Sequence, residues 1–464
     1  MRKTTFEQTP KTKIMKNLFA LLFAAACCLL SIDASAQCNG RYYDEVFPKP
    51  DVFITILGIP LPDVSKLNQT KVTYGSAEGQ NLEMYVLQPE GDTAEKRPLV
   101  MLAFGGSFTA GFKESPDIIK LCQEFTARGF VTVSIDYRLL PGTSPIDSAN
   151  MLKQVVKAVQ DTKAAIRYFY QDAATTNTYK IDTNKIFVGG TSAGAFIGIH
   201  LAYLTDTVGI QQWMKDIIAS QGELEGTSGN PGYSSRVAGV INLAGAIGDT
   251  AWIDAGEAPM VSMHGNQDGT VPYCSEIINV SGNDIIVVDG SATIKARTVH
   301  LGIKNSFYTW RNADHVPYVD PTPTSEGPAY MDTTVWFVRN FLYEQMTGIE
   351  CGQALAAAGK VSAPCGYPIE DTTNTGIEPV LLSGDFSVYP NPSSDVIYIE
   401  KPNEITGSAD VEVYDNIGRR VKSYHNIPNT FTISKKELGA GVFIVKMIPA
   451  NKSLGIARTK VVFE

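Results

Sequence analysis

The stretch IFVGGTSAG, residues Ile186–Gly194, joins an apolar run to a segment rich in small residues. The run predicts a buried strand, and the segment after it predicts a helix. A serine at such a junction takes a strained backbone conformation, and its neighbours must be small because the strand and the helix approach closely. Gly190, Ala193 and Gly194 meet this requirement. The stretch therefore predicts a nucleophile elbow with Ser192 at its tip, in preference to a purely structural turn.

On either side of this elbow, between about Lys71 and Gly348, short apolar runs alternate with longer helix-compatible segments. Several runs are continuously apolar, as strands buried on both faces are. The β-α-β-α order predicts an α/β fold with a mostly parallel sheet flanked by helices. The predicted strands are Leu82–Leu87, Leu99–Phe104, Val131–Asp136, Lys185–Gly189, Val237–Leu243, Met260–His264 and Ser306–Trp310. The predicted helices are Ile118–Arg128, Ala149–Tyr170, Ala193–Tyr203 and Met331–Gln345.

Paired glycines close the strand that ends near Phe104. Gly105, Gly106 and Ser107 follow it directly, so their backbone N–H groups can face a substrate without a side chain in the way. Together with the N–H of Ala193, at the start of the predicted helix, they are candidates for an oxyanion hole. The alternative is a plain glycine turn.

The partners of a catalytic serine follow it along the chain in the order acid, then histidine. Asp268 lies in a loop just beyond the strand that ends at His264, and His315 follows the last predicted strand. Loops at the carboxyl ends of parallel strands meet at one edge of the sheet. We therefore expect His315 to act as the general base and Asp268 to orient its ring. Asp314 competes as the acid, but adjacent side chains diverge.

The sequence contains five histidines, and the other four fit the role of the base less well. His200 lies within the helix after the elbow, where packing is expected. His264 precedes the acid and more naturally supports its loop. His300 enters a strand from the wrong end of the sheet, and His425 lies in a different domain.

The segment Thr205–Ser235 interrupts the alternation with a short helical pattern and a Gly/Ser-rich run. It is either a small cap over a pocket or an ordinary surface insertion. Phe108 and Trp252, in loops near the predicted mouth of the site, are candidates to line a substrate pocket, and ordinary packing is the alternative for each.

The N-terminus has the pattern of an export signal. Lysines precede the apolar run Leu18–Leu30, and Ala34-Ser35-Ala36 supplies a small-residue cleavage site, so we expect a signal peptide over 1–36. The run is too short to favour a membrane-spanning helix. A lipoprotein signal with Cys27 as the modified residue is a poorer match, since Ala24–Ala26 precede it.

Removal of 1–36 takes five basic and two acidic residues from totals of 39 and 48, which leaves a net charge of −12. An acidic chain disfavours nucleic acid and anionic membranes as partners. Five cysteines remain, namely Cys38, Cys122, Cys274, Cys351 and Cys365. Export favours disulfides, and the odd number leaves at least one thiol unpaired. Cys351 and Cys365 form the nearest local pair, although the connectivity stays open. No Cys/His pattern indicates a metal site, and we expect no cofactor.

Composition changes after Gly348. Residues 349–380 contain an alanine run, prolines and polar residues with little periodicity, which is typical of a linker. In the final stretch, 381–464, apolar residues alternate with polar ones, as in Val411-Glu412-Val413-Tyr414. This period of two, between turn residues, predicts a small all-β sandwich without helices.

Residues 71–348 resemble an α/β-hydrolase of the carboxylesterase and lipase kind. The resemblance rests on Gly190–Gly194, Phe104–Gly106, Ser134–Leu139 (SIDYRL), Asp268 and His315. Esterases similar to hormone-sensitive lipase carry H-G-G-G-[FW] at the oxyanion position and S-x-D-Y-R-L after the next strand. Here Phe104 replaces the histidine and Ser107 replaces the third glycine, which departs from that pattern. The resemblance implies a structural role for Asp136.

The C-terminal stretch resembles the sorting domain of the type IX secretion system of the Bacteroidetes. The matching residues are Val388–Pro392 (VYPNP), Val413–Arg419 (VYDNIGR) and Gly441–Lys446 (GVFIVK). The resemblance implies export across the outer membrane of a Gram-negative bacterium, to the medium or the cell surface, with the secretion machinery as a partner. A carbohydrate-binding or spacer sandwich is the alternative.

These features predict a signal peptide at 1–36, a catalytic domain at 37–348, a linker at 349–380 and a sorting domain at 381–464. The predicted activity is hydrolysis of carboxylic esters through an acyl-enzyme on Ser192. The ester substrates expected are acyl groups on polysaccharides, short-chain lipids or polyesters. Two alternatives stay open: a secreted serine peptidase, which the lack of a preceding peptide-gating domain disfavours, and an inactive surface-binding protein, which the presence of all three candidate residues disfavours.

Overall fold

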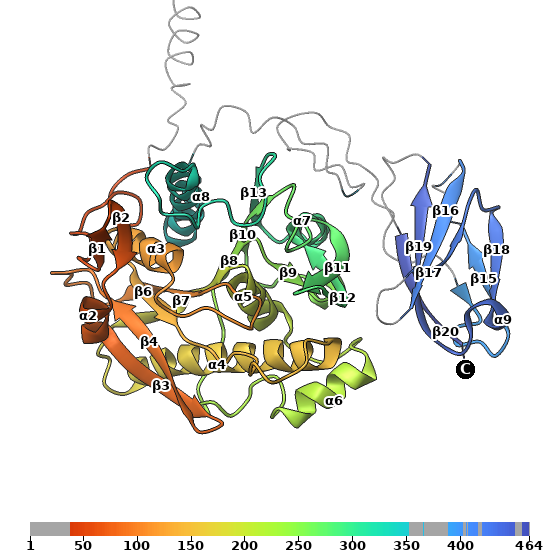
Figure 1. The fold of residues 1–464 in the computed structure, drawn as a ribbon, viewed down its shortest axis with the longest axis horizontal. Coiled ribbons are helices and arrows are strands. Elements are labelled where there is room, and N and C mark those ends of the chain that lie inside the picture. Colours follow the sequence, from red (N-terminus) through yellow and green to blue (C-terminus); the bar gives the residue numbers. More distant parts are fainter. Residues whose placement is uncertain are drawn as a thin grey trace, which may run out of the picture.

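The structure is a computed structural model that describes residues 38–351, 365, 388–401, 405, 407–415, 420–450 and 457–463. The predicted signal peptide, 1–36, and most of the predicted linker, 349–380, lie outside the described residues. Figure 1 shows the larger, N-terminal part built around one sheet with helices on both of its sides.

The central sheet has eight strands in the order β13-β10-β8-β7-β5-β6-β4-β3. In chain order these strands are β3 (Lys71–Ala77), β4 (Gln80–Leu87), β5 (Arg97–Ala103), β6 (Val131–Ile135), β7 (Ile181–Thr191), β8 (Gly239–Leu243), β10 (Met260–Gly265) and β13 (Asn305–Trp310). The strands from β6 to β13 in this order are parallel to their neighbours, whereas β4 pairs antiparallel with β6 and β3. The predicted mostly parallel α/β sheet is confirmed.

All seven predicted strands are present, with ends that differ by a few residues. Every residue of β5, β6, β8 and β10 is buried, as expected of strands that are covered on both faces. The edge strand β3 was not predicted, because exposed polar residues alternate with partly buried ones, Tyr74 alone is buried, and Gly75 interrupts the run.

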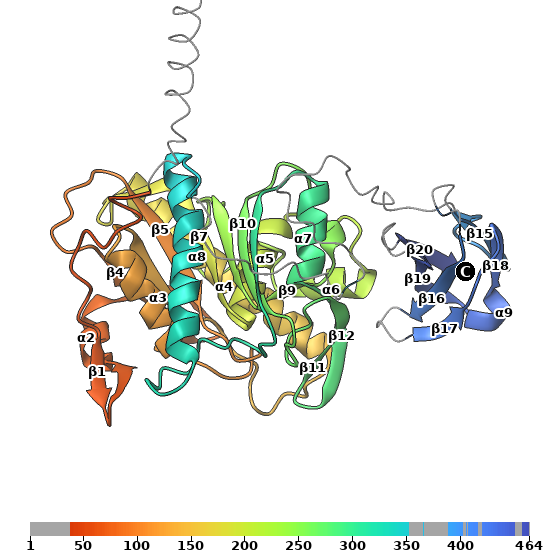
Figure 2. The same cartoon turned by 90° about the horizontal axis from the view of Figure 1, so that it is seen from above.

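The four predicted helices are α3 (Pro116–Thr126), α4 (Ser148–Ala174), α5 (Ala193–Tyr203) and α8 (Gly327–Thr347). Asp147 caps α4 by accepting a hydrogen bond from the N–H of Asn150 at 2.8 Å, and α8 ends at Gly348 with φ of 72°. In Figures 1 and 2, α3 and α8 lie together on one side of the central strands, and α4 lies on the other. The described residues also include α2 (Val64–Leu67) and α6 (Gln212–Ser220).

Helix α7 (Ser291–His300) was missed from sequence. Its β-branched residues, Thr293, Ile294, Thr298 and Val299, favour strands over helices. Packing of its buried face against the sheet supplies the stability that the intrinsic propensity lacks. His300 therefore ends a helix that leads into β13.

Two small sheets accompany the central one. Strands β1 (Phe53–Ile56) and β2 (Ile59–Pro62) form a hairpin near the N-terminus. Strands β11 (Ser275–Val280) and β12 (Asn283–Gly290) form a second hairpin, which β9 (Ala246–Ile247) joins through β12. Ser281 and Gly282, with φ of 51° and 85°, make the tight turn of this second hairpin.

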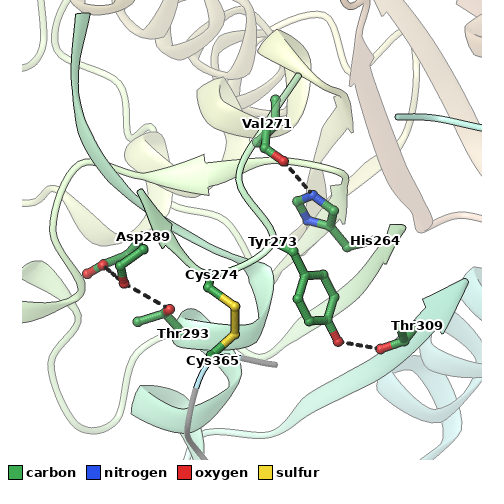
Figure 3. Close-up of a disulfide and its surroundings, with 9 residues drawn as sticks. His264, Val271, Tyr273, Cys274, Asp289, Thr293, Thr309 and Cys365 are labelled. Atoms are coloured by element: carbon green, nitrogen blue, oxygen red, sulfur yellow. Dashed lines mark hydrogen bonds between the residues drawn. A yellow bond between two sulfur atoms is a disulfide. The ribbon is translucent and has the colours of Figure 1, made fainter. Parts of the chain in front are cut away.

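Two disulfides tie distant parts of the chain together. Cys38 pairs with Cys351, and Cys274 pairs with Cys365 (Figure 3). The expected local pair of Cys351 with Cys365 is therefore wrong, because each partner lies closer in space to a cysteine remote in sequence. Within the described residues, Cys122 is left as a buried free thiol.

The C-terminal part holds a separate hydrophobic core between two antiparallel sheets. One sheet has the order β14-β15-β18 and the other β17-β16-β19-β20. These strands are β14 (Val388–Tyr389), β15 (Val396–Glu400), β16 (Ala409–Asp415), β17 (Arg420–Tyr424), β18 (Thr430–Ser434), β19 (Gly441–Pro449) and β20 (Ala457–Phe463). A one-turn helix, α9 (Lys435–Leu438), departs from the expectation of no helices, and Ser434 with Glu437 forms its capping box.

Candidate active site

Ser192 occupies a sharp turn between β7 and α5. Its φ of 55° and ψ of −117° are strained for a residue with a side chain. A Cβ atom on Gly190 or on Gly194 would lie 2.0 Å from the carbonyl oxygen of Ala103 in β5. The elbow therefore requires glycine at both positions, because the turn and the helix start press directly against the neighbouring strand.

The structure brings Ser192, His315 and Asp268 into one hydrogen-bonded chain. The Nε2 atom of His315 lies 2.9 Å from Oγ of Ser192, and its Nδ1 atom lies 2.7 Å from Oδ2 of Asp268. With the proton on Nδ1, the ring donates to the carboxylate and leaves Nε2 free to accept the serine proton. The geometry suits a nucleophile, a base and an orienting acid; these roles stay predictions.

Asp268 is held as an anion in a buried position. Its Oδ1 atom accepts hydrogen bonds at 2.8 Å from the backbone N–H groups of Thr270 and Val271. Burial alone would raise the pKa of this carboxyl, but hydrogen bonds from His264 and His315 outweigh it and hold the pKa well below its usual range. The carboxylate thus stays ionised throughout the neutral and mildly acidic range.

His264 is a second histidine on the same acid. Its Nε2 atom lies 3.1 Å from Oδ2 of Asp268 and 3.2 Å from the carbonyl oxygen of Val271. Because both neighbours are acceptors, Nε2 must carry a proton. Its Nδ1 atom lies 2.7 Å from Oγ of Ser291, which also accepts from Nδ2 of Asn242 at 3.0 Å. The loop-supporting role expected for His264 thus extends to direct contact with the acid.

The disulfide Cys274–Cys365 lies close behind this loop. Figure 3 shows it beside Tyr273, whose ring packs edge-on against that of His264 with centroids 5.5 Å apart. The Tyr273 hydroxyl also bonds to Oγ1 of Thr309 in β13 at 2.6 Å. The disulfide therefore anchors the segment that follows the acid.

The predicted oxyanion residues lie against the nucleophile. A Cβ on Gly105 would come within 3.2 Å of the Ser192 Cβ. Within the described part of the chain, the N–H groups of Gly105, Gly106 and Ala193 donate to no protein acceptor. The N–H of Ser192 itself is not available, because it donates to Leu243 O at 2.8 Å.

Two residues with side chains take left-handed backbone conformations in this loop. Ser107 has φ of 51° and Phe108 has φ of 61°. Ser107 therefore has a backbone conformation that would cost less free energy for a glycine at the same position. The oxyanion role of Gly105, Gly106, Ser107 and Ala193 stays a prediction.

Phe104 stands where the esterase motif has a histidine. Its contacts with Tyr137 fix the end of β5. Its ring stacks on Tyr137 with centroids 4.3 Å apart, and the Tyr137 hydroxyl donates to the carbonyl oxygen of Phe104 at 2.9 Å. Asp136 accepts a hydrogen bond from Nζ of Lys113 at 2.6 Å and takes no part in the hydrogen-bonded chain of the candidate site. This agrees with the structural role expected for it.

The competing residues occupy other positions. Asp314 accepts from the N–H groups of Gly269 and His315 and so ties the two loops together, while its carboxylate makes no bond to an imidazole. His200 is buried in α5, and His425 bonds to Asp410 in the C-terminal sheets. Burial lowers the pKa of His200 to about 4, so its ring is neutral at neutral pH.

A cavity of about 110 Å³ opens from Ser192. Both predicted pocket residues, Phe108 and Trp252, line it. So do Met214 and Ile218, the two buried residues of α6, so the segment Thr205–Ser235 contributes to the wall of the pocket.

Sequence reasoning missed most of the rest of this lining, to which α4, α5 and the β11–β12 hairpin contribute. One signal was present in α4, where Met151, Val155 and Val159 recur every fourth residue and so share one face of the helix. The sequence of the β11–β12 hairpin contains no comparable pattern to indicate that it lies beside the cavity.

Within the described ranges, no group of three or more acidic, histidine or cysteine side chains is arranged to hold a metal ion. The helices that the structure describes include none with the length and apolar character needed to cross a membrane.

Comparison with known families gives two matches. Residues 83–247 match the BD-FAE family model, an esterase-like α/β-hydrolase domain, and residues 387–462 match the secretion system C-terminal sorting domain. The sorting domain indicates that the chain is secreted or carried on the cell surface. The comparison with curated proteins found no match.

Among solved structures, the chain is similar to esterase 2 of Thermogutta terrifontis. For the form phosphonylated by cyclosarin, the identity is 22% over 59% of this chain and 93% of that one, with a TM-score of 0.44. For the propionate-bound form, the identity is 20% over 62% and 96% of the two chains, also with a TM-score of 0.44.

Proposed function

We propose that this α/β-hydrolase with a C-terminal sorting domain is a secreted serine hydrolase of carboxylic esters. The observation that carries the proposal is the continuous chain from Ser192 Oγ through the His315 ring to Asp268 Oδ2, with contacts of 2.9 and 2.7 Å. An inactive descendant of the fold would have no reason to keep all three side chains in this alignment beside an open cavity.

In the first half of the reaction, Oγ of Ser192 attacks the ester carbonyl carbon while its proton passes to Nε2 of His315. The carbonyl oxygen becomes an oxyanion, to which the N–H groups of Ala193 and of the Gly105–Ser107 loop donate hydrogen bonds. Each such donor contributes about 3–4 kcal/mol to lowering the barrier. Asp268 stabilises the imidazolium that forms.

Collapse of this intermediate breaks the bond between the carbonyl carbon and the alcohol oxygen. The leaving oxygen takes the proton from His315, and the acyl group remains on Ser192. A water molecule then attacks the acyl-enzyme and gives one proton to His315. The acid departs as the proton returns to Ser192 Oγ, which restores the starting state.

The experiment compares the full chain with its Ser192→Ala variant on p-nitrophenyl butyrate, a peptide anilide and a fluorophosphonate probe. We expect ester hydrolysis and covalent labelling in the wild type, and a fall in kcat of about 10⁴-fold or more in the variant. Activity on the anilide alone would indicate a peptidase. A folded wild type that neither turns over nor becomes labelled would indicate a binding protein.

We also propose the division of the chain into a signal peptide at 1–36, a catalytic domain at 37–348, a linker at 349–380 and a sorting domain at 381–464. The hydrophobic clusters of the described residues support it, because three lie wholly within the proposed catalytic domain and one lies wholly within the proposed sorting domain. The ester substrates within reach of a secreted enzyme include acylated polysaccharides, short-chain lipids and polyesters.

A further inference from the structure

The wall of the cavity beside Ser192 is built mostly from aliphatic side chains, together with the aromatic rings of Phe108, Phe196 and Trp252. α4 contributes Val155 and Val159, α6 contributes Met214 and Ile218, and the β11–β12 hairpin contributes Ile286, among others. No Asp, Glu, Lys or Arg is among the described residues that line it. An interior of this kind favours apolar chains and gives no attraction to a charged group.

Two polar side chains of the wall, Ser148 and His200, already have partners within the protein. Ser148 donates to the carbonyl oxygen of Ile285 at 2.5 Å. The neutral ring of His200 bonds to the carbonyl oxygen of Phe196 through Nδ1 and accepts from the N–H of Gly248 through Nε2.

Asn279 and Trp252 also offer little to a polar ligand. The Asn279 amide donates to Asp284 at 3.0 Å and accepts from the N–H of Gly282 at 2.8 Å. Trp252 turns the carbon edge of its six-membered ring toward Gly248. A phenol or sugar hydroxyl placed beside Ser148, His200 or Asn279 would replace few of the hydrogen bonds that it loses to water.

The volume limits the length of chain that fits. Water-sized groups can occupy about 110 Å³ of the cavity, and one such group needs roughly 10–15 Å³. The space therefore holds on the order of ten non-hydrogen atoms, which is far more than an acetyl group would fill.

We propose that this cavity binds an aliphatic chain of about six to ten carbons on the ester substrate, in preference to an acetyl, hydroxycinnamoyl or sugar group. The inference rests on the proposed ester hydrolysis and narrows its substrate class to lipid-like or polyester-like esters with such a chain. Burying each added methylene removes apolar surface from water, so kcat/KM rises with chain length until the cavity is full.

The first test uses the full chain and two series of soluble esters. One series varies the acyl group, from p-nitrophenyl acetate to butyrate, octanoate and laurate, and the other varies the alcohol, from ethyl to octyl acetate, with methyl ferulate beside them. We expect kcat/KM to rise at least tenfold from the two-carbon to the eight-carbon member in one series, and that series identifies the side of the ester bond that enters. A maximum at two carbons in both, or methyl ferulate as the best ester, would overturn the proposal while leaving ester hydrolysis intact.

A pair of variants on α6 locates the effect in the cavity. Ile218 is buried and lines the wall, whereas Ile217 beside it is partly exposed and does not. Ile218→Phe should lower the octanoate-to-acetate ratio of kcat/KM about tenfold or more, and Ile217→Phe should leave this ratio unchanged. Equal ratios in the two variants would contradict the assignment of the chain to this cavity.

Binding to the Ser192→Ala variant tests occupancy without turnover. Octanoate should raise the melting temperature of this variant in a concentration-dependent way, and acetate and ferulate at equal concentration should not. Introducing Ile218→Phe into the variant should abolish the shift. If the wild type hydrolyses no ester but this shift appears, the proposed reaction fails and the cavity assignment stands; absence of the shift overturns the assignment.

Discussion

His264 and His315 share a single carboxylate oxygen, Oδ2 of Asp268, at 3.1 and 2.7 Å. The side chain of Asp268 is fully buried, so the oxygen cannot be reached by water from another direction. The His264 ring contacts Asp268 on one side, and the His315 ring joins Asp268 to Ser192 on the other. We therefore predict that His264 acts as a positioning residue through Asp268.

Replacing His264 should therefore impair turnover more than substrate binding. In His264→Phe an aromatic ring is kept but the Nε2 donor is lost, so Asp268 gains freedom to rotate away from His315. We expect kcat to fall about ten- to a hundredfold with KM nearly unchanged, as removal of one supporting contact does. His264→Gln, which restores a donor, should recover part of the loss. A folded His264→Phe chain with wild-type kcat would limit His264 to a packing role.

The sequence was enough to predict the features that depend on residues close together in the chain or on the order of the strands. The run Ile186–Gly194 contains its own strand, turn and helix signals, and the order of Ser192, Asp268 and His315 along the chain matches the order of strands that present them. These predictions depend on steric contacts between neighbouring residues and on the fact that parallel strands end at one edge of the sheet. They can therefore be made from one sequence.

Features that arise from long-range contacts could not be predicted in this way. The cavity wall combines α4, α6 and the β11–β12 hairpin, and no local pattern states that these elements meet. The pairing of Cys274 with Cys365 spans 91 residues and depends on where the chain passes after α8. Helix α7 forms against its own β-branched composition because the sheet buries one of its faces.

The tight contact at the elbow predicts a large effect from one methyl group. Gly194→Ala would place a Cβ 2.0 Å from the Ala103 carbonyl oxygen, so α5 or β5 must shift and Ser192 moves with the helix start. We expect a loss of about 1–3 kcal/mol in unfolding free energy and at least a hundredfold loss of kcat/KM. Gly142→Ala is the matched control, since its added Cβ meets no atom within 4 Å. Urea unfolding and ester kinetics on both variants measure the two effects. Equal unfolding free energies and equal kcat/KM values in the two variants would contradict steric crowding at the elbow.

The buried pair of Arg138 and Asp161 supplies a prediction about stability. The guanidinium donates to both oxygens of Asp161, with contacts of 2.8 to 3.1 Å, and Ser228 donates to the same carboxylate at 2.6 Å. Asp161→Asn removes the charge that neutralises a nearly buried arginine, so we expect a loss of about 3–5 kcal/mol. Glu95→Gln, which breaks the exposed pair with Lys180, should change stability by less than about 1 kcal/mol. Chemical denaturation of the two variants gives their unfolding free energies. A similar, small loss of unfolding free energy in both would show that the buried pair is not needed for stability.

The acid dependence of stability should reveal the ion cluster around Glu124. Burial alone would raise the pKa of this carboxyl, but hydrogen bonds from Lys120, Lys49 and Arg128 outweigh it and lower the pKa to about 2. Because the folded-state pKa lies below the unfolded value, the carboxylate stabilises the fold above about pH 4.5, and this contribution disappears as the pH falls toward 2. Lys49 and Lys120 are partly exposed, so solvent screening limits the effect to about 1–2 kcal/mol. Glu124→Gln should be less stable than the wild type by this amount at pH 7, and the difference should shrink below about pH 4.5 and vanish only below the folded-state pKa of about 2. A difference that stayed constant from pH 7 to pH 2.5 would mean that the lost packing of Glu124, and not its charge, accounts for the destabilisation.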